Sequence, residues 1–337
     1  MIATEEPEII AQSTDNEQLI LIPHLLVGCD GLNSIVRETL HQMSGRSHLF
    51  EMQKFPSPSS GLKYKVLSLP PQFPLSEQPG DISQSTMAYA IRSNFKGRNK
   101  AISLGLLPLK NQDFPRTANI IAYPEHQIWQ LKTKEEIAEF FKQAFPQIPI
   151  EKIISSEEIA RFTSSDGGKF PVPQYCEGLY KILGNPDNNE GTAVILFGDA
   201  VHCFPPDIGQ GVNSALEDIY VFQEILTETQ DNLSQALPQY QKIRQPDIKA
   251  LIRLVQISYP WQYNQDPLQK RLWSLNFFLR LVLSKSLPFI FYPHSFVMIQ
   301  NQELSYSEIL TKSNRTTQIL LMTIVILILF FSTKFSF

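Results

Sequence analysis

The feature that most constrains the fold is a strand-to-helix transition over residues 192–213. The run Thr192-Ala-Val-Ile-Leu-Phe197 is apolar and uninterrupted, and a glycine stands on each side of it. Such a run is typical of a strand that is buried on both faces, as in a parallel sheet. A helix is expected to follow from about Val212. Its predicted inward-facing residues are Ala215, Leu216, Ile219, Phe222 and Leu226.

The turn between this strand and this helix carries groups that a ligand could use. Asp199 stands at the carboxyl end of the strand, where open α/β sheets bind ligands, and its carboxylate can accept hydrogen bonds from a sugar hydroxyl. Gly209 and Gly211 allow close approach of a flat or anionic group to the backbone. The free N–H groups at the helix start favour negative charge there. Taken alone, the pattern is equally compatible with a helix-entry loop whose glycines serve turn geometry.

A second transition of the same kind lies near the N-terminus. Apolar runs at 19–22 and 25–27 are followed at once by Gly28-Cys29-Asp30-Gly31. The pattern predicts two short strands packed on both faces, a tight turn, and a helix that begins after Ser34.

The residues between the two transitions predict a separate sheet. Strand candidates lie at 64–67, 86–91 and 101–107, and the region 55–80 is rich in Pro and Ser. Proline-rich punctuation between short strands is typical of an antiparallel sheet. Thr133 and Glu136 predict a capping box, and the apolar residues that follow predict a helix packed on this sheet.

Composition and charge exclude several functions. The 29 Lys and Arg residues against 33 Asp and Glu residues give a net charge of -4, so no broad basic face is expected and no nucleic-acid partner. The cysteines Cys29, Cys176 and Cys203 form no CxxC pair and lack partners at zinc spacing. We therefore expect no disulfide framework, no metal site and a reducing compartment.

The C-terminal segment predicts a membrane anchor. It reads ILLMTIVILILFF from Ile319 to Phe331, and uncharged flanks extend it over 316–333. That is about the ~17–25 residues that a spanning helix needs. Basic residues on both sides could place their charges at the headgroups. We predict an anchor helix over 316–335 with the bulk of the chain in the cytosol; the alternative is a buried core helix.

Together the two transitions resemble a known family. The pattern GDAxHxxxPxxGQGxN over 198–213, with Asp218 beyond it, is similar to the second FAD motif of flavoprotein aromatic hydroxylases. The segment from Gly28 to Ser34, with Arg37, resembles their DG motif. Both motifs occur in the family's order. Within the family, the segment 240–246 and the apolar C-terminus are most similar to the kynurenine 3-monooxygenase branch.

The resemblance implies a mixed α/β fold. Residues 1–45 and 181–245 would form a partial Rossmann-like FAD-binding domain, and residues 46–180 would form an inserted antiparallel β-sheet substrate domain. Residues 246–312 would form a C-terminal helical region, followed by the anchor helix at 316–335.

The resemblance also implies contacts with FAD. Asp199 would bind the ribose or pyrophosphate region, Asp30 and Gly31 would lie near the pyrophosphate, and Arg37 would brace that turn. Pro206 would line the pocket above the isoalloxazine ring. The backbone N–H groups of the following segment would face the pyrimidine edge of the ring; its residues are Gly209, Gln210, Gly211, Val212 and Asn213.

The activity that the resemblance implies is hydroxylation. In the family, NAD(P)H reduces FAD, and O2 then gives a flavin C4a-hydroperoxide that delivers oxygen to an aromatic ring. At Asp207 and Ile208 this chain departs from the aromatic residues of the family motif. The resemblance therefore implies an aromatic or planar small molecule, and not kynurenine specifically.

No catalytic side chain is assigned. His202 has no recognisable nucleophile and acid partner, so we expect it to make a structural hydrogen bond. Cys203 beside it is not expected to bind a metal, because a distant pair of ligands is lacking. Glu217 and Asp218 are expected to be charges near the helix start that suit its dipole.

A further departure concerns the first 27 residues, which contain no GxGxxG. We therefore expect a truncated chain whose affinity for FAD is weakened. Two alternatives stay open. One is a non-catalytic, membrane-attached remnant of such an enzyme, and the other is a flavin oxidoreductase that transfers hydride without inserting oxygen.

Overall fold

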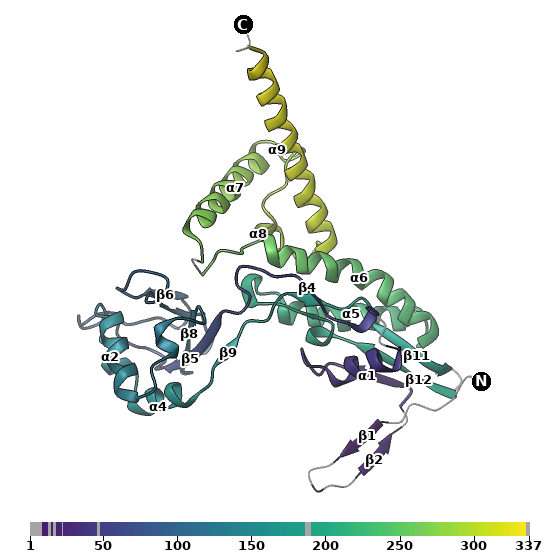
Figure 1. Ribbon diagram of the computed structural model, residues 1–337, viewed down its shortest axis with the longest axis horizontal. Helices are drawn as coiled ribbons and strands as arrows, with labels where there is room; N and C mark the ends of the chain where they lie inside the picture. Colours follow the sequence, from purple (N-terminus) through teal and green to yellow (C-terminus); the bar gives the residue numbers. More distant parts are fainter. Residues whose placement is uncertain are drawn as a thin grey trace. The chain divides into compact units, whose positions relative to one another are not determined.

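The computed structural model describes residues 9–12, 15, 18–21, 23–45, 48–185, 190–263 and 265–334 (Figure 1). The chain divides into two compact units. The first unit consists of residues 1–58 and 172–337, and the second unit consists of residues 59–171.

The main sheet of the first unit contains the predicted strand. Its strands are β11 (Tyr180–Asn185), β12 (Glu190–Leu196) and β3 (Leu25–Gly28), in the order β11-β12-β3. β12 pairs parallel with β3 and antiparallel with β11. Residues 192–197 are buried, so the prediction of a buried parallel strand is confirmed.

The other early strand lies elsewhere. β2 (Gln18–Leu21) pairs with β1 (Ile9–Gln12) in a separate antiparallel hairpin, and Ile20 is exposed. The prediction that this run is packed on both faces is therefore wrong, because β2 does not join the main sheet. Ile22 lies outside the described residues.

Helices follow both strands of the parallel pair. β3 leads into α1 (Ile35–Met43), where the Ser34 hydroxyl accepts a hydrogen bond from the Arg37 backbone N–H. β12 leads through two short turns of 3-10 helix, η4 (Gly198–Ala200) and η5 (Pro206–Ile208), into α5 (Gly211–Glu228). A three-stranded sheet of two-residue strands, in the order β13-β10-β4, lies in the same unit. Its strands are β13 (His202–Cys203), β10 (Gln174–Tyr175) and β4 (Gln53–Lys54).

The buried face of α5 differs from the predicted one. Leu216 and Ile219 are 58% and 50% exposed, so their predicted inward orientation is wrong. The buried residues are Ser214, Asp218, Phe222 and Ile225. The reason is that Asp218 makes buried polar contacts, which fix the rotation of the helix about its axis and turn the aliphatic side chains away.

Helix α6 (Leu233–Ile257) packs on α5 and continues through Pro246. The predicted boundary between 245 and 246 therefore falls inside a helix. Proline removes a backbone donor and usually breaks a helix, but Pro246 is exposed here. Buried residues on both sides of Pro246, such as Tyr240 and Leu251, pack both halves of α6 into the core, so the helix continues.

The second unit contains the predicted antiparallel sheet. Its five strands run in the order β6-β7-β8-β5-β9, and all four pairings are antiparallel. The strands are β5 (Lys63–Leu69), β6 (Tyr89–Arg92), β7 (Ser103–Leu106), β8 (Arg116–Ala122) and β9 (Gly168–Lys169).

Three helices share a core with this sheet: α2 (Lys134–Ala144), α3 (Ile150–Ile153) and α4 (Ser156–Ser164). The capping box of Thr133 and Glu136 is confirmed. The unit is shorter at both ends than the predicted 46–180, because β10 pairs with β4 and with β13 in the first unit.

The C-terminal part of the first unit is helical. It contains α7 (Pro267–Ser286), α8 (Ser295–Met298) and α9 (Tyr306–Lys334). Residues 306–332 of α9 have a mean hydropathy of 1.9 over the most apolar stretch, which is only 6% buried. By length and composition, α9 can cross a membrane, and its apolar run, unlike the first turns of the helix, is not buried in a core.

Candidate functional site

Arg37 joins the two strand-to-helix transitions. Its guanidinium is buried and donates hydrogen bonds to the carbonyl oxygens of Leu32, at 2.9 Å, and Ala200, at 2.7 Å. Leu32 belongs to the turn after β3, and Ala200 belongs to the turn after β12. The two turns that carry the sequence motifs are therefore held side by side.

Asp30 shapes the first of these turns. Its Oδ2 atom accepts hydrogen bonds from the backbone N–H groups of Ile35, at 2.7 Å, and Val36, at 3.3 Å. Burial alone would raise the pKa of Asp30, but hydrogen bonds from Ser34 and the backbone of α1 outweigh it and lower the pKa. Asp30 is thus an ionised cap at the start of α1. Gly31 follows with φ of 84°, a left-handed conformation that favours glycine.

Asp199 stands exposed in the second turn. The Cys203 thiol donates to its Oδ2 atom, with 3.7 Å between sulfur and oxygen. Burial and the nearby Asp199 carboxylate raise the pKa of Cys203 to about 12, so the thiol stays protonated. The Asp199 carboxylate therefore keeps its capacity to accept hydrogen bonds from a ligand.

The start of α5 is open. Gly209 has φ of 64°, and a Cβ built at Gly209 or Gly211 would have no described atom within 4 Å apart from its chain neighbours and the adjoining backbone of α5. Val212 is 74% exposed, and Asn213 is exposed. No side chain of the described part caps this helix. The first N–H groups of α5 are thus presented beside free space, where an added side chain would stand.

The residues before the glycines serve the fold. Pro206 is exposed, whereas Asp207 and Ile208 are buried. The Gln262 side-chain amide donates to the Asp207 carbonyl oxygen at 2.9 Å, and Ile208 packs in a core with residues of α6 and α9. The two departures from the family motif therefore have structural roles here.

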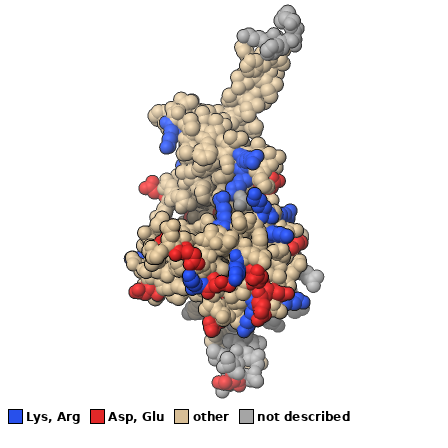
Figure 2. All heavy atoms as spheres, turned by 90° about the vertical axis from the view of Figure 1, so that its left-hand side faces the viewer, with Lys and Arg blue, Asp and Glu red and all other residues tan. Residues whose placement is uncertain are grey.

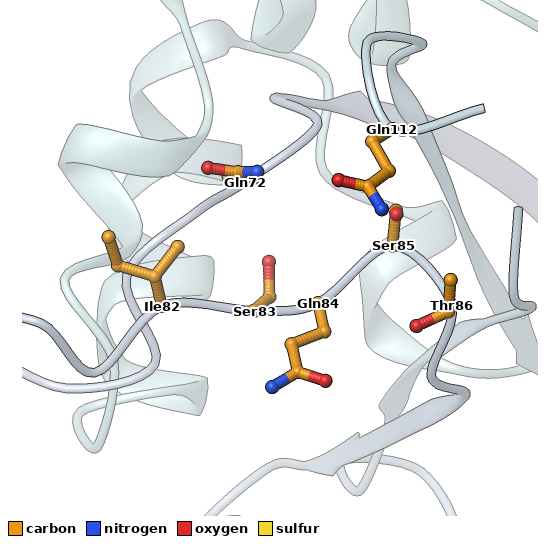
Figure 3. Close-up of a pocket in the computed structure, with 7 residues that line it drawn as sticks. All are labelled: Gln72, Ile82, Ser83, Gln84, Ser85, Thr86 and Gln112. Atoms are coloured by element: carbon orange, nitrogen blue, oxygen red, sulfur yellow. The ribbon is translucent and has the colours of Figure 1, made fainter. Parts of the chain in front are cut away.

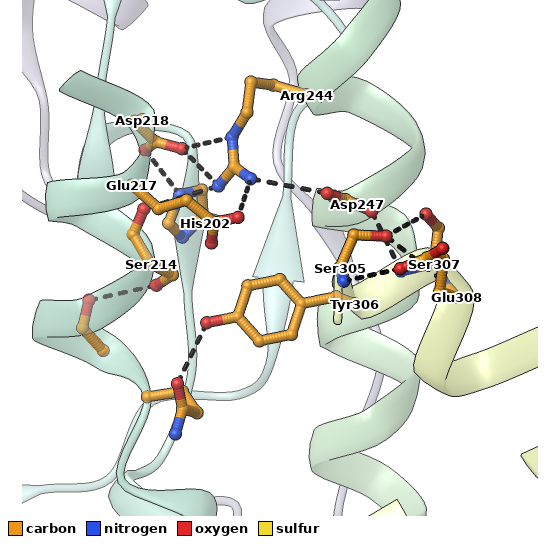
Figure 4. A network of polar contacts seen from close by, with 12 residues as sticks. His202, Ser214, Glu217, Asp218, Arg244, Asp247, Ser305, Tyr306, Ser307 and Glu308 are labelled. Atoms are coloured by element: carbon orange, nitrogen blue, oxygen red, sulfur yellow. Dashed lines mark hydrogen bonds and ion pairs between the residues drawn. The ribbon is translucent and has the colours of Figure 1, made fainter. Parts of the chain in front are cut away.

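A buried polar network lies behind the open turn (Figure 4). Asp218 is fully buried and accepts hydrogen bonds from the Gly198 backbone at 2.9 Å and from His202 Nε2 at 2.8 Å. It also accepts two from Arg244, from Nε at 3.0 Å and from Nη2 at 2.7 Å. The structural hydrogen bond expected of His202 is confirmed. The expectation that Asp218 is an ordinary charge near the helix start is wrong, since it is the centre of this network.

The same arginine reaches two further carboxylates. Arg244 Nη1 lies 3.1 Å from Glu217 Oε1 and 3.6 Å from Asp247 Oδ2. Asp247 Oδ1 accepts a hydrogen bond from the Ser307 backbone at 2.9 Å, and the Tyr306 hydroxyl donates to Gln210 Oε1 at 3.0 Å. These contacts join the start of α9 to α6 and to the glycine turn. Sequence reasoning missed Arg244 and Asp247, although the Arg-x-Pro segment was the available signal.

The network predicts acid sensitivity. Burial alone would raise the pKa of Asp218, but the hydrogen bond and charge of His202, and the Arg244 guanidinium, lower it. Because the folded pKa lies below the unfolded one, the carboxylate stabilises the fold above about pH 4, and this contribution is lost as pH falls through the folded pKa. We expect the free energy of unfolding in urea to fall steeply below about pH 4. D218N should show a shallower fall, and equal slopes for the two proteins would contradict the assignment.

The second unit has a cavity of its own, of about 310 Å³. Figure 3 shows its lining of side-chain amides and hydroxyls. The lining residues are Gln72, Ile82, Ser83, Gln84, Ser85, Thr86 and Gln112. Its lining includes none of the residues that the sequence predicts to contact FAD.

Comparison with known proteins agrees with the motifs. Residues 187–255 match the model of a family described as FAD binding domain. Kynurenine 3-monooxygenase from Sus scrofa is 26% identical over 237 residues, which are 70% of this chain and 43% of that protein. The enzyme of the same name from Saccharomyces cerevisiae is 24% identical over 299 residues, which are 88% of this chain and 59% of that protein. The chain thus spans about half the length of these relatives.

Solved structures also resemble the chain. PqsL, a probable FAD-dependent monooxygenase from Pseudomonas aeruginosa, aligns with a TM-score of 0.43 at 18% identity, covering 77% of this chain and 64% of that one. Klebsiella pneumoniae HpxO complexed with FAD and uric acid aligns with a TM-score of 0.44 at 19% identity, covering 79% and 59%. Residues 187–255 are thus similar to an FAD binding domain, and the kynurenine 3-monooxygenases among the relatives agree with the resemblance of the two motifs.

Proposed function

We propose that this chain is part of an FAD-dependent monooxygenase that hydroxylates an aromatic or planar small molecule, with NAD(P)H as the reductant. The observation that carries the proposal is the open start of α5, which follows η4 and its exposed Asp199 carboxylate in the chain, while Arg37 joins η4 to the turn after β3. The second unit, residues 59–171, is the proposed substrate domain.

The described residues fit FAD in three respects. A Cβ at Gly211 would meet nothing, so the space in front of this backbone is free for a flat ring. The helix start has no side-chain cap, which leaves N–H groups for an acceptor. Asp199 is exposed, and the oxygens of its carboxyl group can accept hydrogen bonds from ribose hydroxyls.

Each proposed contact has a physical purpose. FAD would supply the redox chemistry, accepting hydride from NAD(P)H and reacting with O2. The N–H groups over 209–213, at the positive end of α5, would stabilise negative charge on the pyrimidine edge of the reduced ring. Asp199 would orient the ribose, Asp30 and Gly31 would lie near the pyrophosphate, and Pro206 would limit the space above the ring.

We also propose attachment to a membrane through α9, with the bulk of the chain in the cytosol. The support is a helix long and apolar enough to cross a bilayer, exposed along its apolar part. Lys312 and Arg315 precede that part, and Lys334 follows it, so their charges would lie at the two headgroup layers.

Flavin titration tests the proposal. The chain is titrated with FAD, alone and with a separately made strand–GxGxxG–helix segment, and flavin fluorescence and visible absorption are followed. We expect D199A to weaken binding about tenfold to a hundredfold, the loss of one or two hydrogen bonds to a charged group. D113A, at an exposed Asp of the second unit, should bind FAD like the unchanged chain.

The outcomes separate the candidate functions. If the chain binds no flavin, either alone or with the added GxGxxG segment, the proposal is wrong and a non-catalytic remnant is favoured. If flavin binds, product analysis under labelled O2 distinguishes a monooxygenase from an oxidoreductase that only transfers hydride.

A further inference from the structure

Helix α7 has an apolar stripe that faces outward. Five aliphatic residues recur at alternating spacings of four and three, and each is between 49% and 68% exposed. They are Leu268, Leu272, Leu275, Leu279 and Val282. Phe278 borders the stripe and is 61% exposed. A stripe of this kind on a water-soluble helix normally faces a core.

The opposite face of α7 is held in place, so the stripe cannot turn inward. Trp273 packs against Tyr259 with ring centroids 4.8 Å apart, and Phe277 packs against His294 at 5.6 Å. Arg280 is buried and donates to the Ser313 carbonyl oxygen at 3.2 Å. These contacts fix the rotation of α7 about its axis.

Helix α7, which carries the stripe, contacts α9 just before the apolar run of α9 begins. Arg280 also donates to Thr317 Oγ1 at 2.8 Å, two residues before the apolar run 319–331 begins. Figure 1 shows the end of α7 drawn beside α9. The segment after α7 is apolar and exposed as well, with Phe289 93% exposed. Exposed apolar residues therefore continue from α7 into the segment that follows it, and Arg280 holds α7 against α9.

The net charge of residues 267–337 differs in sign from that of the rest of the chain. Residues 267–337 contain seven Lys and Arg residues and two Glu residues, a net charge of +5. Residues 1–266 contain the remaining 22 basic and 31 acidic residues, a net charge of -9. Figure 2 shows little red surface around α9. A basic, apolar surface is complementary to anionic lipid.

We propose that α7 lies in the interfacial layer of an anionic membrane. The aliphatic stripe enters the acyl region, and Lys270, Arg271 and Lys285 lie at the headgroups. The chain is then attached in two ways, through one spanning helix and one interfacial helix. This inference rests on the proposed membrane attachment through α9.

The spacing of the stripe would also suit a coiled coil with a second copy of the chain. The charges favour lipid instead, because α7 has basic residues and no Asp or Glu. Two copies in contact would bring like charges together without the opposite charges that usually flank such a seam.

Depth measurements on the full chain in anionic vesicles test the proposal. Single cysteines are introduced by L275C on the stripe, V325C in α9 and L107C in the second unit, in a C29S background. Cys176 and Cys203 are buried, so the new thiol is the one labelled. Each site carries an environment-sensitive fluorophore, and the vesicles contain lipids brominated near the headgroup or at the chain end.

We expect bromine near the headgroup to quench the label at 275 several-fold more than bromine at the chain end does. The label at 325 should show the opposite preference. The label at 107 should not respond. If the label at 325 responds and the label at 275 does not, α7 is not interfacial while attachment through α9 stands. If neither responds, membrane attachment itself fails. Disulfide formation between copies at position 275, without lipid quenching, would assign the stripe to a second copy and overturn the inference.

A variant set gives a second measurement. In the L275C protein, adding L272S and L279S should reduce the quenching of the label at 275 by headgroup bromine several-fold, because the stripe that buries this site is removed. The matched control M87S/F114S removes two exposed apolar side chains from the second unit and should leave this quenching unchanged. Equal quenching in the two backgrounds would contradict a role for the stripe.

Discussion

Replacing Arg244 by methionine is expected to destabilise the first unit by about 3–5 kcal/mol. Arg244 is fully buried and lies within 4 Å of carboxylate oxygens of Glu217, Asp218 and Asp247. Methionine fills a similar volume but leaves these carboxylates without their shared cation. The uncompensated charge of Asp218, which is also fully buried, accounts for most of the expected loss.

Urea unfolding followed by circular dichroism measures this loss. K249M is the matched control, because Lys249 lies on the same helix and pairs with Glu177 at a partly exposed position. Exposed pairs contribute little, so K249M should cost under about 1 kcal/mol. If R244M and K249M unfold at the same urea concentration, the buried network does not stabilise the fold.

The second large effect is expected at Arg37. R37M removes the hydrogen bonds to the Leu32 and Ala200 carbonyl oxygens and leaves both acceptors unpaired beside a buried apolar chain. Hydrogen bonds from a charged group contribute about 1.5–3 kcal/mol each, so we expect the loss of both to cost about 3–6 kcal/mol. The two motif-bearing turns should also separate, which would weaken flavin binding more than stability alone predicts.

Two readouts check the Arg37 prediction. Urea unfolding gives the stability, and FAD titration at a temperature where both proteins are folded gives the affinity. R253M, which removes an exposed arginine of α6, is the control and should change neither. R37K should show losses of stability and affinity between those of R37M and R253M. One ammonium group cannot reproduce the guanidinium fork that reaches two carbonyl groups.

Local patterns in the sequence predicted the elements that depend on neighbouring residues. The run at 192–197, the box of Thr133 and Glu136, and the helix start after Ser34 are all short-range signals, and each corresponds to an observed element. Strand β8 was not predicted, because its buried face begins with Arg116 and contains two alanines. That composition hides the alternation of apolar and polar residues by which a strand is recognised.

Long-range pairing explains what else was missed. The buried face of α5 is decided by Asp218 and its partners Arg244 and His202, which lie 26 and 16 residues away in sequence. Hydrophobic periodicity alone favours Leu216 and Ile219 for that face, and it contains no information about a buried cation on another helix. The candidate ligand residues could be proposed because they lie in two short motifs, whereas the frame behind them is assembled by folding.

The hydrogen bond from Tyr306 to Gln210 gives the base of α9 a direct mechanical connection to the glycine turn. The bond from Ser307 to Asp247 fixes the same base to the charged frame behind that turn. A tilt of α9, imposed by bilayer thickness or by detergent, would therefore be transmitted to the backbone on which a flavin is proposed to rest. The lipid composition would then change the absorption spectrum and the reduction potential of a bound flavin, although no lipid contacts the flavin.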